Sequence, residues 1–252
     1  MTWLLTLAFD GTEYCGFQVQ PNGRSVAAAF QDGLEAVIGR RPDIKGCSRT
    51  DAGVHALGFA LSFEADLRIP PEKLPLALNT KLPRDIRVLS ARVVPGGFHA
   101  RYAAHTKTYL YRIRNSPIDS PFEERYYCRI PGRLDVERMQ RAAAHFVGTH
   151  DFLALCAAHS SAAAHGDTVR TITACGAERH GDTVEITVTA DGYLYNMVRI
   201  LAGTLCEAGA GRLDPEAVPA ILASRDRRLA GPTLPAKGLF LHHVDYGKEA
   251  EG

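Results

Sequence analysis

The order of predicted secondary structure repeats along the chain, and this repeat constrains the fold more than any other feature. Hydrophobic residues in the first half recur with strand and helix periods, which predicts a strand, a helix, two strands, a helix and a strand. These elements are expected over Thr2–Phe9, Ser25–Gly39, Ile44–Cys47, Leu57–Glu64, Pro70–Leu82 and Ile86–Val94. The β-α-β-β-α-β order is that of a ferredoxin-like unit.

The second half of the chain repeats this order. Its elements are expected over Thr108–Arg114, Asp135–Val147, Val169–Glu178, Thr183–Ala190, Leu194–Ala208 and Gly238–Asp245, with a small extra helix near Pro215–Ser224. We therefore predict an α+β fold of two related ferredoxin-like halves with antiparallel sheets around a cleft. The halves are expected to cover residues 1–104 and 105–252.

The composition is that of an ordinary globular protein, with 46% hydrophobic and 23% charged residues among 252. A bilayer-spanning helix needs about 18 to 20 uninterrupted apolar residues, and no segment provides them, so we expect a soluble, cytoplasmic protein. The net charge is only +1, so any nucleic-acid binding must come from locally concentrated Lys and Arg. The six cysteines lie singly along the chain, which favours buried, reduced thiols over a metal site.

One polar segment, Ser48–His55, lies between two predicted strands and contains a glycine. A loop on a rigid scaffold is where a reactive side chain is commonly held, so Asp51 is a candidate catalytic residue. The alternative is structural: Asp51 would form a turn with its own backbone, and Arg49 would pair with a neighbouring acid.

The segment Arg49-Thr50-Asp51-Ala52-Gly53-Val54-His55 resembles the signature of the bacterial-type tRNA pseudouridine synthase A family. Further segments resemble that family at Phe9–Gln18, Phe98–Arg101, Tyr109–Arg112, Asn196–Arg199 and Gly238–Leu241. The resemblance extends from about Leu4 to Tyr246. It implies two related α+β halves flanking an RNA-binding cleft, a homodimer, and no requirement for a metal or cofactor.

The resemblance also implies an activity, the isomerisation of uridine to pseudouridine at positions 38, 39 and 40 of the tRNA anticodon stem-loop. It implies that Asp51 is the nucleophile. The reaction breaks the N-glycosidic bond and rejoins the base through C5, which requires a carboxylate to form or stabilise an intermediate. Attack on ribose C1′, attack on base C6 and assistance in forming a glycal are all compatible with this residue.

Arg199 and Tyr109 receive roles from the resemblance, and Arg49 receives one from its place two residues before Asp51. Arg199 would pair with Asp51 and keep it ionised, although an arginine there could also end a helix face in solvent beside Tyr195. Tyr109 would stack on the target uracil and help to remove its C5 proton, with Tyr111 as the alternative; a half-buried strand tyrosine is the structural explanation. Arg49 would brace the RNA after the uridine is extruded.

Four basic residues, Arg101, Lys107, Arg112 and Arg114, alternate with aromatic residues, as in a strand that follows a nucleic-acid backbone. A solvated strand edge is the alternative. Three positions depart from the family pattern. Phe17 stands where tryptophan is usual, Ser48 where glycine is usual, and Phe59 where glutamine is usual.

Two other classes of protein are compatible with parts of the sequence. A non-catalytic RNA-binding protein could share the scaffold, but the presence of Asp51 favours an enzyme. A metal-assisted hydrolase could use histidines such as His159, His165, His242 and His243. None of these forms a recognised ligand motif, and neighbouring His242 and His243 would point to opposite faces of a strand.

Overall fold

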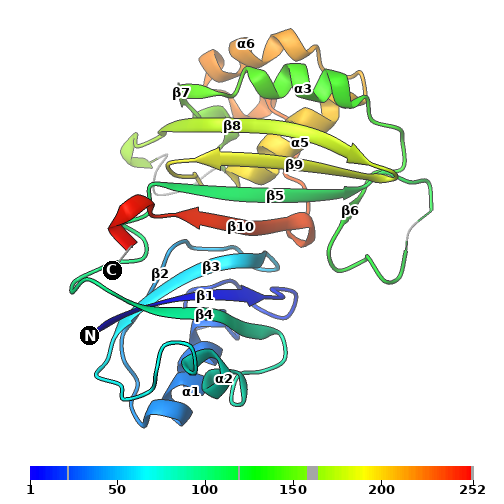
Figure 1. Cartoon of the computed structure of the whole chain (residues 1–252). Helices are drawn as coiled ribbons and strands as arrows, with labels where there is room; N and C mark the ends of the chain where they lie inside the picture. Colours follow the sequence, from blue (N-terminus) through cyan, green and yellow to red (C-terminus); the bar gives the residue numbers. More distant parts are fainter. Residues whose placement is uncertain (22, 119, 158–163, 251–252) are drawn as a thin grey trace. The chain divides into compact units, whose positions relative to one another are not determined.

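A computed structural model describes all residues of the chain except 22, 119, 158–163 and 251–252 (Figure 1). It divides into two compact units. The first unit contains Met1–Lys107 together with Phe240–Gly252, and the second contains Thr108–Leu239.

The first unit has the predicted β-α-β-β-α-β order. Its strands are β1 (Thr2–Phe9), β2 (Ile44–Gly46), β3 (His55–Glu64) and β4 (Ile86–Val94). Strand β1 lies between β4 and β3, β2 pairs with β3, and all these pairs are antiparallel. Apolar residues that face each other across β1 and β3, such as Leu5 opposite Leu61, are fully buried and form the core of this unit.

Two helices, α1 (Val26–Ile38) and α2 (Leu74–Asn79), lie on the same side of this sheet in Figure 1. Helix α1 begins and ends as predicted. The Ser25 hydroxyl accepts a hydrogen bond from Ala28 N, and Gly39 takes the left-handed conformation with φ 72°. Helix α2 ends at Asn79, three residues before the predicted end at Leu82, and Leu82 itself precedes Pro83, a position that disfavours helical backbone.

The last strand, β10 (Leu239–Asp245), lies mostly in the first unit, whereas the sequence placed it in the second half. Its residues Phe240 and Leu241 pair in parallel with His55 and Ala56 of β3, so Phe240–Gly252 belongs to the first unit rather than the second. Gly58 permits this approach, because a Cβ there would lie 2.5 Å from the His242 carbonyl oxygen. The sheet of the first unit is therefore mostly, but not entirely, antiparallel.

The second unit is built on β5 (Thr106–Arg114), β9 (Thr183–Ala190), β8 (Val169–His180) and β7 (Gly148–Asp151), which are neighbours in that order. Strands β8 and β9 form an antiparallel hairpin whose turn contains Gly181. The short strand β6 (Cys128–Arg129) pairs in parallel with β5. Neither β6 nor β7 was predicted from the sequence.

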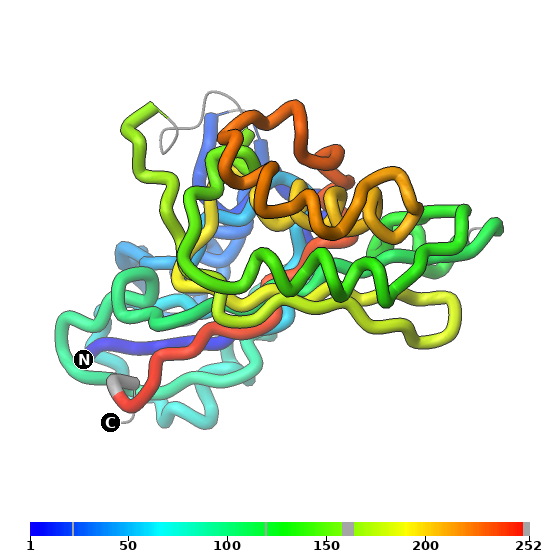
Figure 2. Tube along the Cα trace, turned by 90° about the horizontal axis from the view of Figure 1, so that it is seen from above, coloured from blue at the N-terminus to red at the C-terminus, as the bar shows by residue number. Residues whose placement is uncertain are grey.

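Helices α3 (Val136–Ala144), α5 (Met197–Gly209) and α6 (Val218–Ser224) belong to this unit, and α3 packs against both α5 and β8. Figure 2 shows α3 and α6 side by side over the strands, in green and orange. The described residues also form short 3-10 helices at Leu153–Leu155, Pro215–Ala217, Arg227–Leu229, Ala236–Gly238 and Gly247–Ala250.

Helix α5 starts three residues later than the predicted start at Leu194. Asn196 has φ 61°, a left-handed conformation that interrupts the chain just before the first helical residue, Met197. Tyr195 therefore precedes the helix, whereas Arg199 lies in its first turn.

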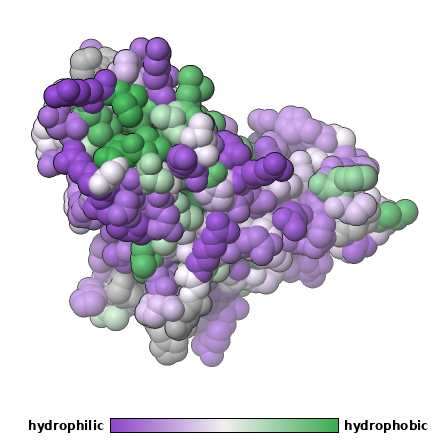
Figure 3. Space-filling view, turned by 90° about the horizontal axis from the view of Figure 1, so that it is seen from below, coloured by the Kyte–Doolittle hydropathy of each residue, from purple (hydrophilic) through white to green (hydrophobic). Residues whose placement is uncertain are grey.

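The surface seen in Figure 3 is mostly hydrophilic, with one compact hydrophobic area. Within the described part of the chain, no helix has both the length and the apolar content to cross a membrane. All six cysteines are free thiols, and Cys47, Cys128, Cys156 and Cys206 are buried. Burial raises the pKa of the Cys47 thiol to about 12, which keeps it protonated and chemically inert.

Candidate active site

Asp51 lies on the connection between β2 and β3, where the sequence predicted a loop between strands. The carbonyl oxygen of Asp51 accepts a hydrogen bond from Val54 N at 3.2 Å, which closes a tight turn. Gly53 occupies this turn with φ 76°, a conformation that favours glycine. Asp51 is partly exposed and Arg49 is exposed, whereas Thr50 between them is buried, so the loop presents both charged side chains outward.

A second segment, Asp10–Phe17, holds this loop in place through backbone hydrogen bonds. Gly53 N donates to the Tyr14 carbonyl at 3.2 Å, and Phe17 N donates to the Thr50 carbonyl at 3.1 Å. These bonds lie on either side of Asp51 in the sequence. The backbone that carries the carboxylate is therefore fixed at both ends.

Two glycines allow the segments to approach so closely. A Cβ at Gly11 would lie 2.0 Å from the Val54 carbonyl oxygen, and a Cβ at Gly16 would lie 2.5 Å from the Thr50 carbonyl oxygen. Gly16 also has φ 111°, which disfavours any other residue. Gly11 and Gly16 thus leave the room that the Asp51 loop needs beside the Asp10–Phe17 segment.

His55, the last residue of the signature, is 1% exposed and anchors the loop from the strand side. Its Nδ1 accepts a hydrogen bond from Gly11 N at 3.0 Å and lies 3.2 Å from Oδ1 of Asp10. Its ring stacks on Phe240 of β10, with centroids 4.7 Å apart. Sequence reasoning gave His55 no role, because its contacts come from segments far away in the chain.

Tyr109 and Arg199 both lie in the second unit. Tyr109, on β5, is 6% exposed, and its ring meets that of Tyr193 edge-on at 4.9 Å. Arg199, in the first turn of α5, donates from Nε to the Leu234 carbonyl at 2.7 Å and from Nη1 to the Asn196 side-chain oxygen at 2.8 Å. Both side chains are thus held by neighbours in their own unit.

The four predicted site residues are divided between the units. The structure brings Arg49 and Asp51 together on one loop of the first unit, and it places Tyr109 and Arg199 in the second. The predicted pairing of Asp51 with Arg199 stays a prediction.

The predicted basic row receives only partial support. Arg112 Nε lies 3.1 Å from Glu185 Oε1, and Arg114 Nε lies 3.3 Å from Glu123 Oε2. Because carboxylates of the same unit compensate these two positive charges, we expect the arginines to attract a phosphate backbone less strongly. Arg101 is exposed and lies over the ring of Tyr102, 5.9 Å from its centroid.

The departures at Phe17 and Phe59 prove to be related. Both side chains are buried, and their rings stack with centroids 4.4 Å apart and an interplanar angle of 28°. The two unusual residues form one apolar contact beneath the Asp51 loop.

Among the described residues there is no group of three or more His, Cys, Asp or Glu side chains arranged to hold a metal ion. His242 and His243 lie on β10 and are exposed, while His159 falls outside the described residues.

Comparison with known protein families identifies the family of this chain. The family model described as tRNA pseudouridine synthase matches residues 6–103 and 142–247. The chain belongs to the tRNA pseudouridine synthase family. Arg49, Asp51 and Arg199 lie within the matched segments, whereas Tyr109 falls between them.

Curated relatives in this family cover nearly the whole chain. The tRNA pseudouridine synthase A of Moorella thermoacetica is 46% identical over 96% of this chain and 98% of its own length. The enzyme of the same name from Shouchella clausii is 44% identical over 96% of this chain and 92% of its own length. The enzyme of the same name from Bacillus pumilus is 42% identical over 96% of this chain and 97% of its own length.

Proposed function

We propose that this chain isomerises uridines at positions 38, 39 and 40 of the tRNA anticodon stem-loop to pseudouridine, with Asp51 as the catalytic nucleophile. The observation that carries the proposal is the placement of Asp51. Its carboxylate lies on a loop fixed by Tyr14 on one side and Phe17 on the other, within a segment matched by the family. Catalysis requires such fixed geometry, because a reacting group must be held close to its bonding partner.

The reaction breaks the bond between N1 of uracil and C1′ of ribose and forms a bond between C5 and C1′. The hydrogen on C5 is then released as a proton, and N1 gains one, so the product is an isomer of the substrate. Asp51 can assist by attacking C1′, by attacking C6, or by removing a ribose proton. Each route needs the carboxylate ionised and free to reach the nucleotide.

The other site residues complete the proposal. Tyr109 stacks on the extruded uracil and takes part in removal of the C5 proton. Arg199 stabilises the ionised form of Asp51. Arg49, two residues from the nucleophile and exposed, contacts the RNA where the uridine has left its stack; extrusion costs a few kcal/mol, and such contacts offset it.

The proposal includes no metal or cofactor, because the reaction rearranges bonds within one nucleotide without net oxidation or hydrolysis. It also includes a homodimer and a cytoplasmic location. The homodimer rests on the family resemblance.

Tritium release tests the activity directly. Unmodified tRNA transcript containing uridine tritiated at C5 is incubated with the protein, and tritium appearing in water is counted. The proposal predicts near-stoichiometric release from the anticodon stem-loop uridines. Intact tRNA binding without release would contradict it and favour a non-catalytic RNA-binding protein.

A further inference from the structure

The Asp10–Phe17 segment, which holds the Asp51 loop, is itself held by a residue from a third part of the chain. The Tyr14 hydroxyl donates a hydrogen bond to Oδ1 of Asp85 at 2.6 Å. The backbone carbonyl of the same Asp85 accepts a hydrogen bond from Asp10 N at 2.9 Å. Asp85 thus binds the segment at two points, one through its side chain and one through its backbone.

Tyr14 joins Asp85 to the catalytic loop. Its side chain is 3% exposed and ends at Asp85, whereas its backbone carbonyl accepts the hydrogen bond from Gly53, two residues after Asp51. A shift of the Tyr14 ring therefore displaces the acceptor that fixes Gly53. Burial, followed by the hydrogen bond to Asp85, raises the pKa of the Tyr14 phenol, so that it remains a donor at neutral pH.

Arg24 adds a charge to this pair. Its guanidinium lies 4.8 Å from the centroid of the Tyr14 ring, and its Nη1 lies 3.9 Å from Oδ2 of Asp85. The arginine side chain is 52% exposed and that of Asp85 28%, so the ion pair itself contributes little. Arg24 lies beside the second carboxylate oxygen, Oδ2, while Oδ1 accepts the hydrogen bond from Tyr14.

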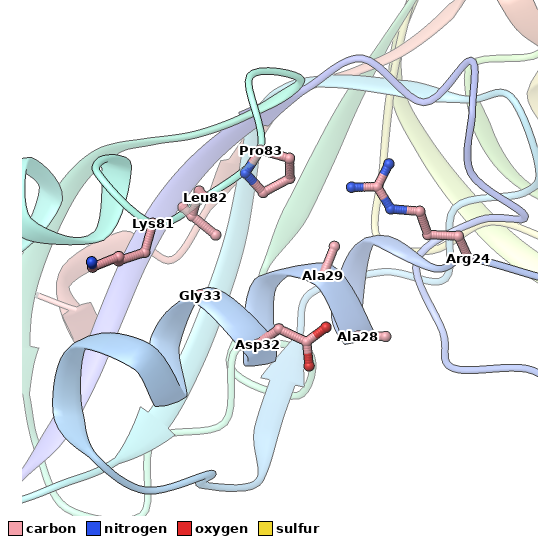
Figure 4. Close-up of a pocket in the computed structure, with 8 residues that line it drawn as sticks. All are labelled: Arg24, Ala28, Ala29, Asp32, Gly33, Lys81, Leu82 and Pro83. Carbon is pink, nitrogen blue, oxygen red and sulfur yellow. The ribbon is translucent and has the colours of Figure 1, made fainter.

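The loop that carries Asp85 is packed firmly against α1. Figure 4 shows Lys81, Leu82 and Pro83 facing Gly33 and Ala29 across a hollow that Arg24 also lines. A Cβ at Gly33 would lie 2.6 Å from Cδ2 of Leu82, so only glycine admits this contact without a shift. Asp85 lies three residues after Leu82, so this packing helps to fix its position.

From this chain of contacts we infer that Tyr14 and Asp85 are positioning residues, whose hydrogen bond sets the location of the Asp51 carboxylate in the reaction. The inference rests on the proposed function of Asp51. Neither residue needs to touch the substrate. A displacement of about 1 Å at a reacting group can lower a rate by about a hundredfold, so the effect of a lost anchor falls on turnover rather than on tRNA binding.

Tyr14→Phe removes the hydroxyl and keeps the ring. Tyr246→Phe is the matched control, because Tyr246 is also buried in the first unit, and its hydroxyl donates at 2.7 Å to the carbonyl of Ala100, which lies outside the Asp10–Phe17 segment. Each variant loses one side-chain hydrogen bond made by a buried tyrosine. Tritium release is measured at saturating and limiting tRNA, and unfolding in urea confirms that both variants are folded.

We expect Tyr14→Phe to lower kcat by about tenfold or more with KM within about twofold, and Tyr246→Phe to leave both nearly unchanged. Asp85→Ala should lower kcat as much as Tyr14→Phe does. The double variant should be no slower than either single variant, because both substitutions remove the same hydrogen bond between Tyr14 and Asp85. Asp85→Asn keeps an oxygen acceptor and should recover part of the turnover lost in Asp85→Ala.

The wild type and Asp51→Ala are assayed alongside. An active wild type whose Tyr14→Phe variant has the kcat of Tyr246→Phe would overturn the positioning role alone. An active wild type that does not need Asp51 would overturn the catalytic assignment, and with it the positioning role. A wild type that releases no tritium would overturn the proposed function itself.

Discussion

The rings of Phe17 and Phe59 stack 4.4 Å apart at an interplanar angle of 28°, and both side chains are buried. Phe17 is the last residue of the Asp10–Phe17 segment that holds the Asp51 loop, and Phe59 lies on β3, the strand that follows this loop. A Cβ at Gly46 would lie 2.4 Å from Phe17 and 2.9 Å from Phe59, so the stacked rings leave no room for a side chain at this position of β2. The two rings therefore form one apolar contact between the Asp10–Phe17 segment and β3.

Phe59→Gln should destabilise the protein by about 2 to 4 kcal/mol. The change removes a fully buried ring and places an amide against the remaining Phe17 ring. Urea unfolding of the variant measures the loss. Adding Phe17→Trp should recover part of it if the two positions are coupled; an additive or larger loss in the double variant would contradict the coupling.

Gly16→Ala should lower both stability and turnover. A Cβ at Gly16 would lie 2.5 Å from the Thr50 carbonyl oxygen, and its φ of 111° disfavours alanine, at a cost of about 1 to 3 kcal/mol. Gly181→Ala is the matched control, because Gly181 has φ 60° but open space around it, which limits the cost to about 1 to 2 kcal/mol. The control should keep full turnover, and equal kcat in the two variants would show that Gly16 has no special relation to the site.

Tyr109→Phe should keep the ring contact with Tyr193 and tRNA binding but lose at least about a hundredfold in kcat, as expected when a group that transfers a proton is removed. The comparison is Tyr109→Leu, which removes the ring as well and should also raise KM. Normal turnover by Tyr109→Phe would remove the proton-transfer role while leaving stacking intact.

His99 should make the stability of the protein depend on pH. Burial, followed by the nearby positive charge of Lys45, lowers the pKa of His99 below 6.5, and Arg101 N donates to Nδ1 of its neutral ring at 3.1 Å. The unfolded chain then binds the proton more readily than the folded one. The stabilisation is fully present above about pH 6.5 and is lost as pH falls through the folded pKa.

Urea unfolding of the wild type and of His99→Gln at about pH 8 and about pH 5 tests this effect. The wild type should lose more stability between the two conditions than the variant. An equal loss in both proteins would assign the pH dependence to other groups.

The elements of the first unit could be predicted because their signals are local. Alternation identifies β1 and β3, and Ser25 and Gly39 mark the two ends of α1. The parallel pairing of β10 with β3 could not be predicted, because it joins residues about 185 positions apart in the sequence and depends on the absence of a side chain at Gly58. The start of α5 was missed because the left-handed backbone at Asn196 leaves no clear trace in the sequence.

Part of the candidate active site could also be predicted from the sequence. The polar, glycine-containing loop indicated Asp51, but only the family resemblance supplied Tyr109 and Arg199, since a strand tyrosine and a helix arginine have common structural explanations. Tyr14 and Asp85 were missed because the hydrogen bond that joins them connects residues 71 positions apart in the sequence. Gly11 and Gly16 belonged to a segment that had been noticed, yet their purpose becomes visible only beside the Thr50 and Val54 carbonyls.

The central claim is that Asp51 carries out the isomerisation, and pseudouridine mapping of tRNA transcripts tests it most directly. Unmodified transcripts are incubated with the wild type or with Asp51→Asn, and each uridine is then assayed for conversion, with tRNA binding measured in parallel. The wild type should yield pseudouridine at positions 38, 39 and 40 wherever a uridine occurs there, and Asp51→Asn should bind tRNA equally well and yield none. Pseudouridine formed by Asp51→Asn at a rate near that of the wild type would contradict the account.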